Sequence, residues 1–234
     1  MKPNDQKLYD KFAKDWWDPK KEFFALKHLN IPRFEYFDRF IPNWTGMKIL
    51  DVGCGGGFAS EILAEKGAIV SGIDQSEKLI EVAKQHASDN GLEINYQQGV
   101  AESLPYGDQS FDAVFCVDVL EHVNSVDATI SEISRVLKPT GRLLFDTINR
   151  TVSAKLTMIW ILEDLMREIP KGIHDWNKFI KPEELLETLK QSGFQSFDIR
   201  GLDIKGKDKK TGLFKTQLND NTSVMYIGKC DKQV

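Results

Sequence analysis

The chain has 234 residues, 41% of them hydrophobic, and a formal net charge of −4. This apolar content is enough for one buried core, so we expect a single domain over residues 1–234, and the negative charge argues against a dedicated nucleic-acid binder and favours a small-molecule substrate. Cys54, Cys116 and Cys230 are too few and too scattered for a disulfide framework or a zinc site, and no segment approaches the ~20 apolar residues of a membrane span. We therefore expect a cytoplasmic protein, soluble or at most peripheral at the inner face of a membrane.

The first 45 residues are expected to form a helical cap that acts as a lid. Residues 4–17 place Leu8, Phe12 and Trp16 on one helical face. The helix should stop at Pro19, because a proline forbids its continuation.

Residues 46–150 alternate between short apolar runs and helical periodicity. This alternation predicts a Rossmann-like α/β core with a doubly wound, mostly parallel sheet. Parallel sheets bind ligands at the carboxyl ends of their strands, so functional residues should follow positions 50, 73, 97, 117 and 147. After a first strand that ends at Leu50, the predicted elements are a helix at 58–66, a strand at 69–73, a helix at 76–89, strands at 93–97 and 111–117, a helix at 125–137 and a strand at 141–147.

A glycine-rich turn follows the first strand and its terminal carboxylate, Asp51. Glycines let the backbone approach a ligand, and the helix that begins near Phe58 offers unpaired N–H groups to it, as in a nucleotide-binding turn. Gly53, Gly55 and Gly57 give the spacing G-x-G-x-G, and Phe58 stands where an NAD-dependent dehydrogenase has its third glycine. The spacing therefore favours S-adenosylmethionine over NAD as the ligand.

Two further acids follow the second and third strands. Asp74 ends the second strand, 23 residues after Asp51 (74 − 51 = 23), where a carboxylate can accept both hydroxyls of a ribose. Asp74 can also cap the helix that follows, and both roles can be filled together. The segment 99–102 is placed to present backbone N–H groups and Glu102 to an adenine ring, and an ordinary surface loop accounts for Glu102 nearly as well.

Two acids and an imidazole follow the fourth strand: Asp118, Glu121 and His122. If this segment is helical, the three side chains share one face. They could orient and deprotonate a hydroxyl group, with His122 as the base, or hold a divalent ion that does so. Asp118 and Glu121 also have the spacing of a capping box, and spacing alone leaves the catalytic and the capping interpretations open.

Residues 151–180 interrupt the alternation as an inserted helical segment. Its helix, 153–169, could be a lid over an apolar substrate or an interfacial helix at a membrane surface, and ordinary core packing explains it equally well. His174, beside Asp175 and Trp176 in the following loop, is a candidate for the acceptor pocket. The apolar face of the helix comprises Met158, Ile159, Leu162, Leu165, Met166 and Ile169, widened by Trp160 and Ile161, and Glu163, Asp164 and Glu168 are assigned to its polar side.

Residues 181–234 are expected to supply a last helix and the final strands. The helix begins at Lys181–Pro182, and strands near 196–204 and 223–229 bring the sheet to seven strands. The basic stretch 205–212 between them is interpreted as a solvated loop, with contact to anionic groups as the alternative.

These features together resemble class I S-adenosylmethionine-dependent methyltransferases, and within them the ubiquinone-biosynthesis O-methyltransferases that act on polyprenylated catechols. The resemblance covers nearly the whole chain, and the terminal segments and residues 170–182 carry its specific part. The matching segments are Trp16–Asp18, Glu22–Phe23, Asn30–Arg33, Asp51–Gly57, Leu120–Val123, Asn149–Arg150, Pro170–Gly172, His174–Asp175 and Lys178–Pro182.

The resemblance implies particular roles for residues in this chain. Cofactor contacts fall on Arg33, Gly53, Asp74 and the main chain around Val117. The catalytic group, in some members with a divalent ion such as Mg²⁺, falls on Asp118, Glu121 and His122. Asp118 departs from the family pattern, which has glutamate there, so chelation at this site is less secure. Membrane association after the fifth strand is also implied.

The predicted function is O-methylation of a catechol hydroxyl on a polyprenylated quinone precursor, with S-adenosylmethionine supplying the methyl group and His122 as the base. Alternatives are methylation of another small phenol or hydroxy acceptor, and a catalytically silent cofactor-binding subunit of a lipid-biosynthesis complex. NAD-linked reduction is a more distant alternative. The expected partners are a lipophilic catechol and members of a biosynthetic complex, with no nucleic acid.

Overall fold

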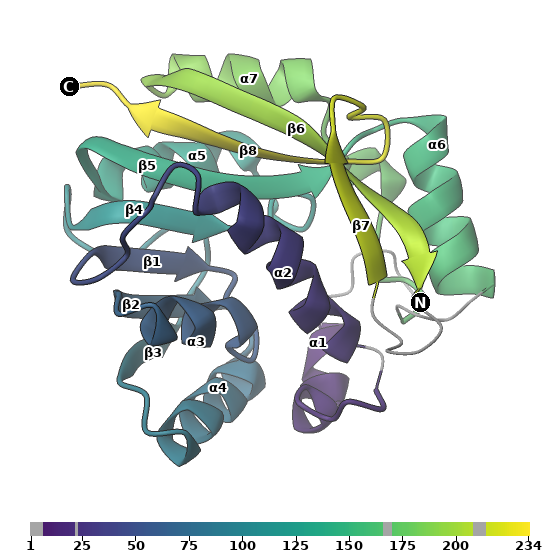
Figure 1. Ribbon diagram of the computed structural model, residues 1–234, viewed down its shortest axis with the longest axis horizontal. Coiled ribbons are helices and arrows are strands. Elements are labelled where there is room, and N and C mark those ends of the chain that lie inside the picture. The colour runs from purple at the N-terminus through teal and green to yellow at the C-terminus, as the bar shows by residue number, and fades with distance from the viewer. Residues whose placement is uncertain (1–6, 22, 166–169, 208–213) are drawn as a thin grey trace.

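The computed structural model describes residues 7–21, 23–165, 170–207 and 214–234. Through these residues runs an eight-stranded sheet in the order β3-β2-β1-β4-β5-β8-β6-β7 (Figure 1). The strand order reverses between β1 and β4, and open α/β sheets bind ligands at such a point. Five neighbouring strands pair in parallel: β1 (Lys48–Val52), β2 (Ile69–Asp74), β3 (Ile94–Gln98), β4 (Phe111–Cys116) and β5 (Leu137–Ile148).

Helices cover both faces of the parallel strands, as the doubly wound prediction requires. Successive strand residues point to opposite faces, so Ile49 packs in one apolar layer and Leu50 in the other. Helices α2 and α3 belong to the layer of Ile49, α5 and α7 to the layer of Leu50, and α4 packs against β3. Their bounds are α2 (Phe24–Phe37), α3 (Phe58–Glu65), α4 (Glu77–Asp89), α5 (Val126–Val136) and α7 (Pro182–Gln191).

The second half of the sheet is antiparallel and contains one strand more than predicted. Strand β8 (Met225–Lys232) pairs with β5 and with β6 (Phe194–Lys207), and β7 (Phe214–Asn219) pairs with β6. The prediction of seven strands is wrong because β7 lies at the sheet edge, where its residues are half-buried or exposed and form no apolar run. Strand β6 also includes the start of the predicted basic loop, whose residues 208–212 lie outside the described residues.

The N-terminal segment folds over the carboxyl ends of the strands (Figure 1). Helix α1 (Lys7–Phe12) continues as a short 3-10 turn, η1 (Ala13–Asp15), so the α-helical part is shorter than predicted. Trp16 is buried and stacks on Phe23 and Phe58, with ring centroids 5.0 and 5.4 Å away. This stacking fixes the segment against the beginning of α3.

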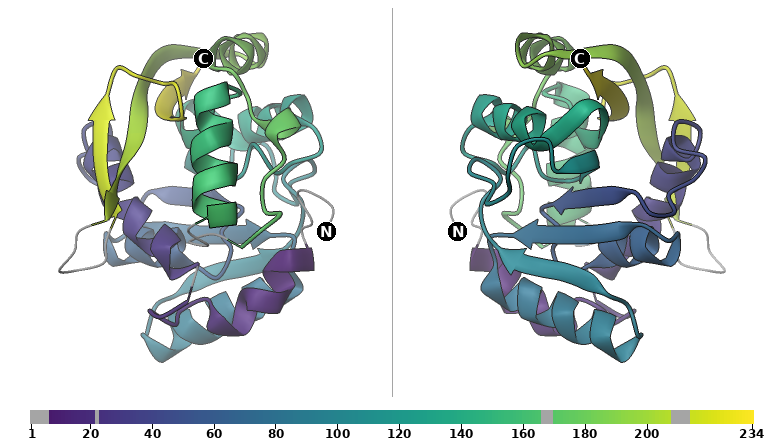
Figure 2. Two further views of the ribbon diagram at one scale, coloured as in Figure 1. Left: turned by 90° about the vertical axis from the view of Figure 1, so that its right-hand side faces the viewer. Right: turned by 90° about the vertical axis from the view of Figure 1, so that its left-hand side faces the viewer.

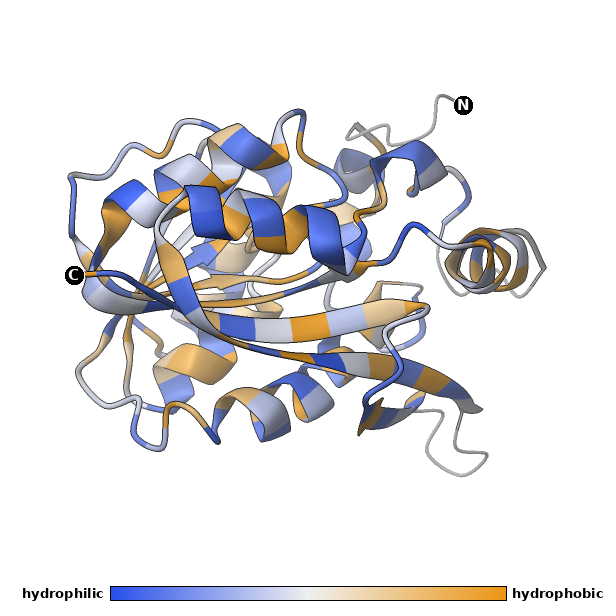
Figure 3. Ribbon diagram, turned by 90° about the horizontal axis from the view of Figure 1, so that it is seen from above, coloured by the Kyte–Doolittle hydropathy of each residue, from blue (hydrophilic) through white to orange (hydrophobic). Residues whose placement is uncertain are grey.

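The inserted segment forms one helix at the side of the molecule, seen face-on in Figure 2 and end-on in Figure 3. It comprises α6 (Val152–Ala154) and the wider, π-type η2 (Lys155–Leu165). Met158 and Leu162 are buried on its inner side, whereas Leu156 and Trp160 are 45% and 52% exposed. No helix in the described parts of the chain is long and apolar enough to cross a membrane.

One predicted feature of this helix is wrong, since Glu163 is buried rather than on a polar surface, with only 2% of its area exposed. The predicted members Met166, Glu168 and Ile169 lie outside the described residues, as do the side chains of Asp164 and Leu165. After the helix, a loop with the short turn η3 (Trp176–Lys178) leads to α7.

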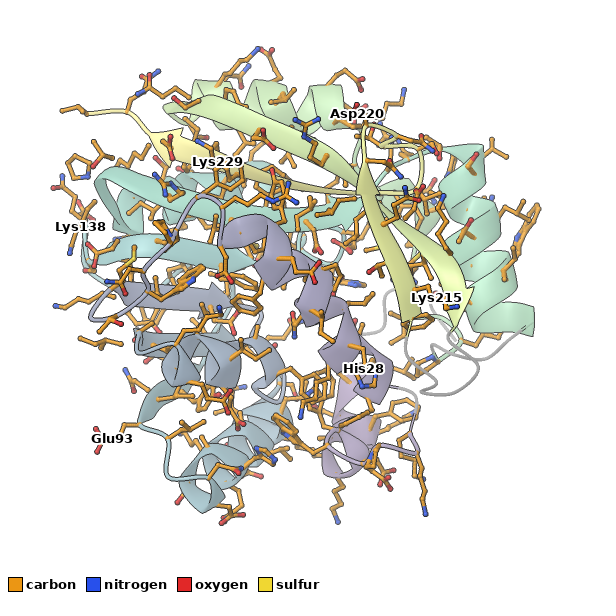
Figure 4. The ribbon with its side chains drawn as sticks, viewed as in Figure 1. His28, Glu93, Lys138, Lys215, Asp220 and Lys229 are labelled. Atoms are coloured by element: carbon orange, nitrogen blue, oxygen red, sulfur yellow. The ribbon has the colours of Figure 1, made fainter. Side chains whose placement is uncertain are left out.

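Charged side chains such as Glu93, Lys138 and Asp220 lie around the outside of the molecule (Figure 4). Many pair locally, as Lys138 Nζ does with Asp112 Oδ1 at 2.6 Å. Exposed pairs of this kind contribute only about 0–1 kcal/mol each. The two apolar layers therefore contribute most of the stability that holds the strand ends in place.

Candidate functional site

A cavity with about 840 Å³ of atom-free space, open to solvent on one side, lies at the carboxyl ends of β1, β2 and β4. This is the edge at which the sequence places the functional residues. The structure brings most of the predicted cofactor residues to its wall. Those that line it are Arg33, Asp51, Gly53, Gly55, Asp74 and Val117, joined by Asp118 and His122 from the predicted catalytic group and by Tyr9, Trp16 and Asn30 from the N-terminal segment.

The glycine turn has the left-handed backbone that the sequence suggests, with φ of +68° at Gly53 and +53° at Gly55. The space around these glycines is also occupied by protein. A Cβ atom on Gly53 would meet Val119 Cγ2 at 2.3 Å, and one on Gly55 would meet the Trp16 ring at 2.8 Å. The turn therefore needs glycine for its own packing under the N-terminal segment as well as for ligand approach.

The third predicted glycine has a structural role. Gly57 does not belong to the wall of this cavity but precedes α3 with φ of +99°, and a Cβ there would meet the Tyr96 hydroxyl at 2.6 Å. Trp17 fastens the turn from outside, because its indole N–H donates to the Gly56 carbonyl at 2.9 Å.

Asp74 is held in a fixed orientation by two backbone donors. The Ser76 N–H donates to Asp74 Oδ1 at 2.8 Å, and the Gly55 N–H donates to Oδ2 at 2.9 Å. Burial raises the pKa of Asp74, and these two bonds oppose the rise. The prediction that Asp74 caps the next helix is wrong, since Ser76 is the cap and accepts from the Leu79 N–H at 3.2 Å. Each Asp74 oxygen retains an acceptor site for a ligand hydroxyl.

Asp51 lies beneath the glycine turn with 1% of its area exposed. The Ser60 hydroxyl donates to Asp51 Oδ2 at 2.5 Å, which ties the end of β1 to α3. Burial raises the pKa of Asp51 to about 7, and the Ser60 bond lowers it in part. Asp51 lines the cavity but is almost fully buried, so it mainly supports the turn and offers little surface to a ligand.

A second, smaller cavity of about 380 Å³ adjoins the first and shares Gly53, Asp74 and Val119 with it. Residues 99–102, for which the sequence predicts a contact with adenine, also line this cavity. Glu102 lines this cavity, and its Oε1 accepts the Asn124 N–H at 2.7 Å. Both interpretations of Glu102 are therefore compatible with its position, because it faces the cavity and also fastens a loop.

Arg33 forms the centre of a buried charge network that sequence analysis missed in part. Its Nε lies 2.6 Å from Asp146 Oδ2, its Nη2 lies 2.6 Å from Asp118 Oδ2, and its side chain is 2% exposed. Burial alone would lower the pKa of Arg33, but the two carboxylates raise it above its usual range, so Arg33 stays charged. Asp146 is fully buried in β5. Its position as a single acid within the apolar run of β5 could have indicated a buried, paired carboxylate.

The segment after β4 is not a helix, which corrects two expectations. Asp118 has a φ of +55°, and its N–H donates to Asp146 Oδ1 at 2.8 Å. The capping-box interpretation is wrong, because this N–H is bound by Asp146 and not by Glu121. Asp118 and Glu121 also do not share a helical face, since the backbone turns between them.

Glu121 points beneath the turn and does not line the three cavities that contain His122. It is 2% exposed, and the Thr147 hydroxyl donates to its Oε2 at 2.7 Å. Burial, followed by the negative charge of Asp118, raises the pKa of Glu121 to about 8. Its contact with Thr147 supports the turn that carries Asp118 and His122.

The raised pKa of Glu121 predicts a pH-dependent stability. Between its ordinary value of 4.5 and about 8, the folded protein holds a proton that the unfolded chain has lost. The free energy of unfolding should therefore fall as the pH rises through this window and stay level above it.

Glu121→Gln keeps an acceptor for Thr147 but cannot titrate. The melting temperature of this variant should fall less than that of the wild type between about pH 5 and pH 8. Parallel profiles would contradict the assignment.

His122 lines the cavity at Gly53 and Asp74, the smaller cavity at residues 99–102, and a third, mostly apolar cavity beside them. Burial, with smaller effects from His174 and Lys178, lowers the pKa of His122 to about 3, so its imidazole is neutral at physiological pH. Its Nε2 lies 3.4 Å from the hydroxyl oxygen of Tyr9. Tyr9 was not selected from the sequence, because it reads there as one more residue of an amphipathic helix.

The third cavity, of about 600 Å³, opens beside the first and shares Tyr9, Leu26, Asp118 and His122 with it. Its wall is mostly apolar and comes from the N-terminal segment, the turn after β4, the inserted helix with the loop after it, and the C-terminal strands. His174, predicted at an acceptor pocket, lines it beside His122. The other lining residues are Phe23, Leu29, Ile148, Met158, Leu162, Pro170, Ile173, Ile204, Phe214 and Met225.

The arrangement of the acids does not fit the divalent ion that the resemblance implies. Asp118 is paired with the Arg33 guanidinium, and Glu121 is directed to Thr147. Among the residues that the structure describes, no three His, Cys, Asp or Glu side chains are grouped as ligands of a metal ion. The predicted Mg²⁺ site at Asp118, Glu121 and His122 is therefore not formed by this arrangement.

Comparisons with known proteins agree with this geometry. A methyltransferase domain family matches residues 50–145. The chain is 39% identical over 224 residues to the ubiquinone biosynthesis O-methyltransferase of Haemophilus ducreyi, with 94% of this chain and 93% of the relative covered. It is 39% identical over 240 residues to that of Pasteurella multocida, with 97% of each chain covered. Over 194 residues it is 42% identical to that of Coxiella burnetii, with 83% of this chain and 82% of the relative covered.

Solved structures share the fold at lower identity. A SAM-dependent methyltransferase from Thermotoga maritima superposes with a TM-score of 0.70 at 17% identity, covering 97% of this chain and 100% of the other. Magnesium protoporphyrin IX methyltransferase from Synechocystis PCC 6803, with bound SAH, gives 0.68 at 22% identity, covering 97% and 95%. The class I methyltransferase fold is confirmed, and the match to O-methyltransferases supports S-adenosylmethionine rather than NAD as the cofactor. By its matches along nearly the whole sequence, the chain belongs to the family of ubiquinone biosynthesis O-methyltransferases.

Proposed function

We propose that this O-methyltransferase methylates a catechol hydroxyl on a polyprenylated quinone precursor. The proposal depends on one observation: a cavity lined by acidic side chains adjoins a cavity lined mostly by apolar ones. The cavity at Gly53 and Asp74 is lined by the acids Asp51, Asp74 and Asp118, and the neighbouring cavity is mostly apolar. They join at Asp118 and His122, so a polar ring with a long apolar tail can reach the cofactor from the apolar side.

The residues of the first cavity fit the parts of S-adenosylmethionine, which supplies an electrophilic methyl group when bound. Asp74 presents two oriented oxygens that can accept the ribose hydroxyls, and residues 99–102 face the adenine. Arg33 Nη2 is buried and forms an ion pair with Asp118 Oδ2 at 2.6 Å, but the angles of this contact are not those of a hydrogen bond. This nitrogen can donate to the cofactor's carboxylate. The nearby acids favour its positively charged sulfonium group.

The apolar cavity fits the acceptor and its tail. Met158 and Leu162 of the inserted helix close one side of it, so this helix acts as a lid over the acceptor. His122, the base that the sequence predicts, lies where the two cavities join. We propose that its neutral imidazole accepts a hydrogen bond from an acceptor hydroxyl and so orients the oxygen toward the methyl group.

No step of the proposed reaction uses Mg²⁺, because the candidate ligands are engaged with Arg33 and Thr147. A phenol with a pKa near 10 is only about one part in a thousand ionised at pH 7. The protein must therefore provide a proton acceptor close to the acceptor oxygen. The imidazole side chains of His122 and His174 at the cavity wall can do this.

The direct test is to incubate the purified chain with S-adenosylmethionine and a catechol bearing a short prenyl chain, and to measure the product by mass spectrometry. The expected result is addition of one methyl group, at a rate that chelator leaves unchanged. Transfer to unrelated phenols but not to the prenylated catechol would reassign the substrate. Tight cofactor binding without transfer would indicate a silent subunit of a biosynthetic complex. Loss of activity with chelator, restored by Mg²⁺, would overturn the metal-independent mechanism.

The inserted helix also supports peripheral membrane contact. Its outer side exposes Val152, Leu156 and Trp160, while its inner side lines the apolar cavity. We propose that this outer side enters the membrane interface, where a lipophilic acceptor resides.

Replacing Leu156 by glutamate should weaken binding to phospholipid vesicles roughly tenfold or more, because burial of one leucine side chain contributes about 1.5–3 kcal/mol. Sedimentation with vesicles measures the binding. Ile31→Glu is the control, since Ile31 is also exposed, at 54%, but lies on α2. Equal binding by wild type and Leu156→Glu would remove the helix from the membrane contact.

A further inference from the structure

A buried carboxylate and an imidazole form a pair at the wall of the apolar cavity. Glu163 of η2 lies inside the protein, and His174 Nδ1 is 2.6 Å from its Oε1. The same carboxylate accepts the backbone N–H of Gly172 at 2.8 Å and of His174 at 3.1 Å. Three donors thus hold Glu163, and they connect the inserted helix to the loop that follows it.

This pairing fixes the tautomer of His174. An ionised carboxylate accepts hydrogen bonds and cannot donate them, so the proton of a neutral His174 must be on Nδ1. Nε2 then carries the lone pair, and His174 lines the cavity beside His122, with ring centroids 5.5 Å apart and planes inclined by 25°. Phe179 contacts the ring of His174 edge-on at 5.8 Å and restrains it further. Among the described residues, Glu163 from η2 and His122 from the turn after β4 contact it, and Tyr9 from α1 and Asp118 are the other titratable groups that line the same cavity.

We propose that His174 is the catalytic base that takes the proton of the acceptor hydroxyl, and that Glu163 is its positioning residue. The proposal rests on the proposed function and names a proton acceptor for it. A carboxylate that orients an imidazole and stabilises the imidazolium is the recurring arrangement for general bases in enzymes. His122 differs, because burial lowers its pKa to about 3 and makes an imidazolium there unfavourable. His122 therefore orients the acceptor hydroxyl, and His174 accepts its proton.

The proton and electron balance is complete without another reactant. The O–H bond of the acceptor breaks and its proton goes to His174 Nε2. An electron pair of the oxygen forms the bond to the methyl carbon of S-adenosylmethionine, and the pair of the breaking C–S bond stays on sulfur. The resulting imidazolium is compensated by Glu163 and loses its proton to water when the products leave.

The test compares His174→Gln and His122→Gln with two acceptors. One is an ordinary prenylated catechol. The other carries a nitro group, so that its hydroxyl is already largely ionised at the assay pH. With the ordinary catechol, His174→Gln should lower kcat by roughly 10²–10⁴-fold, the usual contribution of a general base. With the nitrocatechol this deficit should shrink at least tenfold, whereas the deficit of His122→Gln should be similar for both acceptors.

A second measurement separates catalysis from a merely structural role of the pair. Glu163→Gln has nearly the same size and retains one oxygen that can accept the N–H groups of His174. Its amide nitrogen then lies opposite the Gly172 N–H, and the charge that stabilises an imidazolium is lost. The absorbance of nitrocatechol bound in the presence of S-adenosylhomocysteine reports its ionisation directly. At a pH near its own pKa, the bound probe should be more ionised on the wild type than on His174→Gln or Glu163→Gln.

The inference would be overturned by equal deficits of His174→Gln with both acceptors and an unchanged probe spectrum. It would also be overturned if the acceptor dependence appeared in His122→Gln instead. Failure of the proposed function is a different result, namely no methyl transfer by the wild type to any catechol. Melting temperatures of all variants establish that they are folded.

Discussion

Replacing Arg33 by alanine is expected to lower the free energy of unfolding by about 3–5 kcal/mol, the usual cost of removing one partner from a buried ion pair. The variant would leave Asp118 and Asp146 as two neighbouring carboxylates without their cation, and the Asp146 side chain is 0% exposed. Binding of S-adenosylmethionine should be lost at the same time, because Arg33 Nη2 and the backbone of Asp118 both border its cavity. Denaturant unfolding and calorimetric titration measure the two effects.

Arg39 offers a matched control at the exposed end of the same segment. Arg39→Ala removes the same charge, but Arg39 lies on the surface just after α2, so the change should stay within about 0.5 kcal/mol. Arg33→Lys should be intermediate, since lysine keeps the charge but loses the planar fork that contacts both acids. An Arg33→Ala variant as stable as Arg39→Ala would show that the network does not hold the turn in place.

Replacing Asp74 by asparagine is expected to weaken S-adenosylmethionine binding by about 2–3 kcal/mol, a factor of roughly 30 to 160, because hydrogen bonds to a charged group are lost. The amide also places a donor where the structure needs an acceptor, since both Asp74 oxygens already accept backbone N–H groups. The main change is expected in the dissociation constant, and the melting temperature of the unliganded protein should fall as well, because one of the two backbone N–H groups loses its acceptor.

Asp89→Asn is the control for this substitution, because it makes the same chemical change at the exposed far end of α4. Its dissociation constant should equal that of the wild type. A comparable loss of affinity in both variants would point to a general electrostatic effect of the acidic surface. Unchanged affinity in Asp74→Asn would remove Asp74 from the cofactor site.

The parallel half of the fold follows from local patterns, because its central strands β1 and β4 are apolar on both faces and helical segments alternate with the strands. Ile49 and Leu50 illustrate this, since each packs against a different helical layer. Strand β7 was not recognisable, because an edge strand with half-buried residues has the pattern of a loop. The spacing of Asp118 and Glu121 left open whether a helix follows β4, and the long-range bond from Asp118 to Asp146 decides against one.

The site residues that directly follow strand ends could be predicted from the sequence. Those that depend on contacts between distant segments could not. Gly53, Asp74 and His122 were found from position alone, and Arg33 only through the family resemblance. Glu163 was assigned to a polar surface, because an acid in an amphipathic helix is usually solvated. Its burial depends on donors nine to eleven residues away in a loop. No periodicity encodes such a contact.

The central claim is that cofactor and acceptor meet at His122 from two adjoining cavities. The most direct measurement is a crystal structure of the chain with S-adenosylhomocysteine and a prenylated catechol that cannot be methylated. The account predicts the ribose on Asp74, the ring beside His122 and His174, and the tail along Met158 and Leu162. A nucleoside bound elsewhere, or a catechol ring outside the apolar cavity, would contradict it.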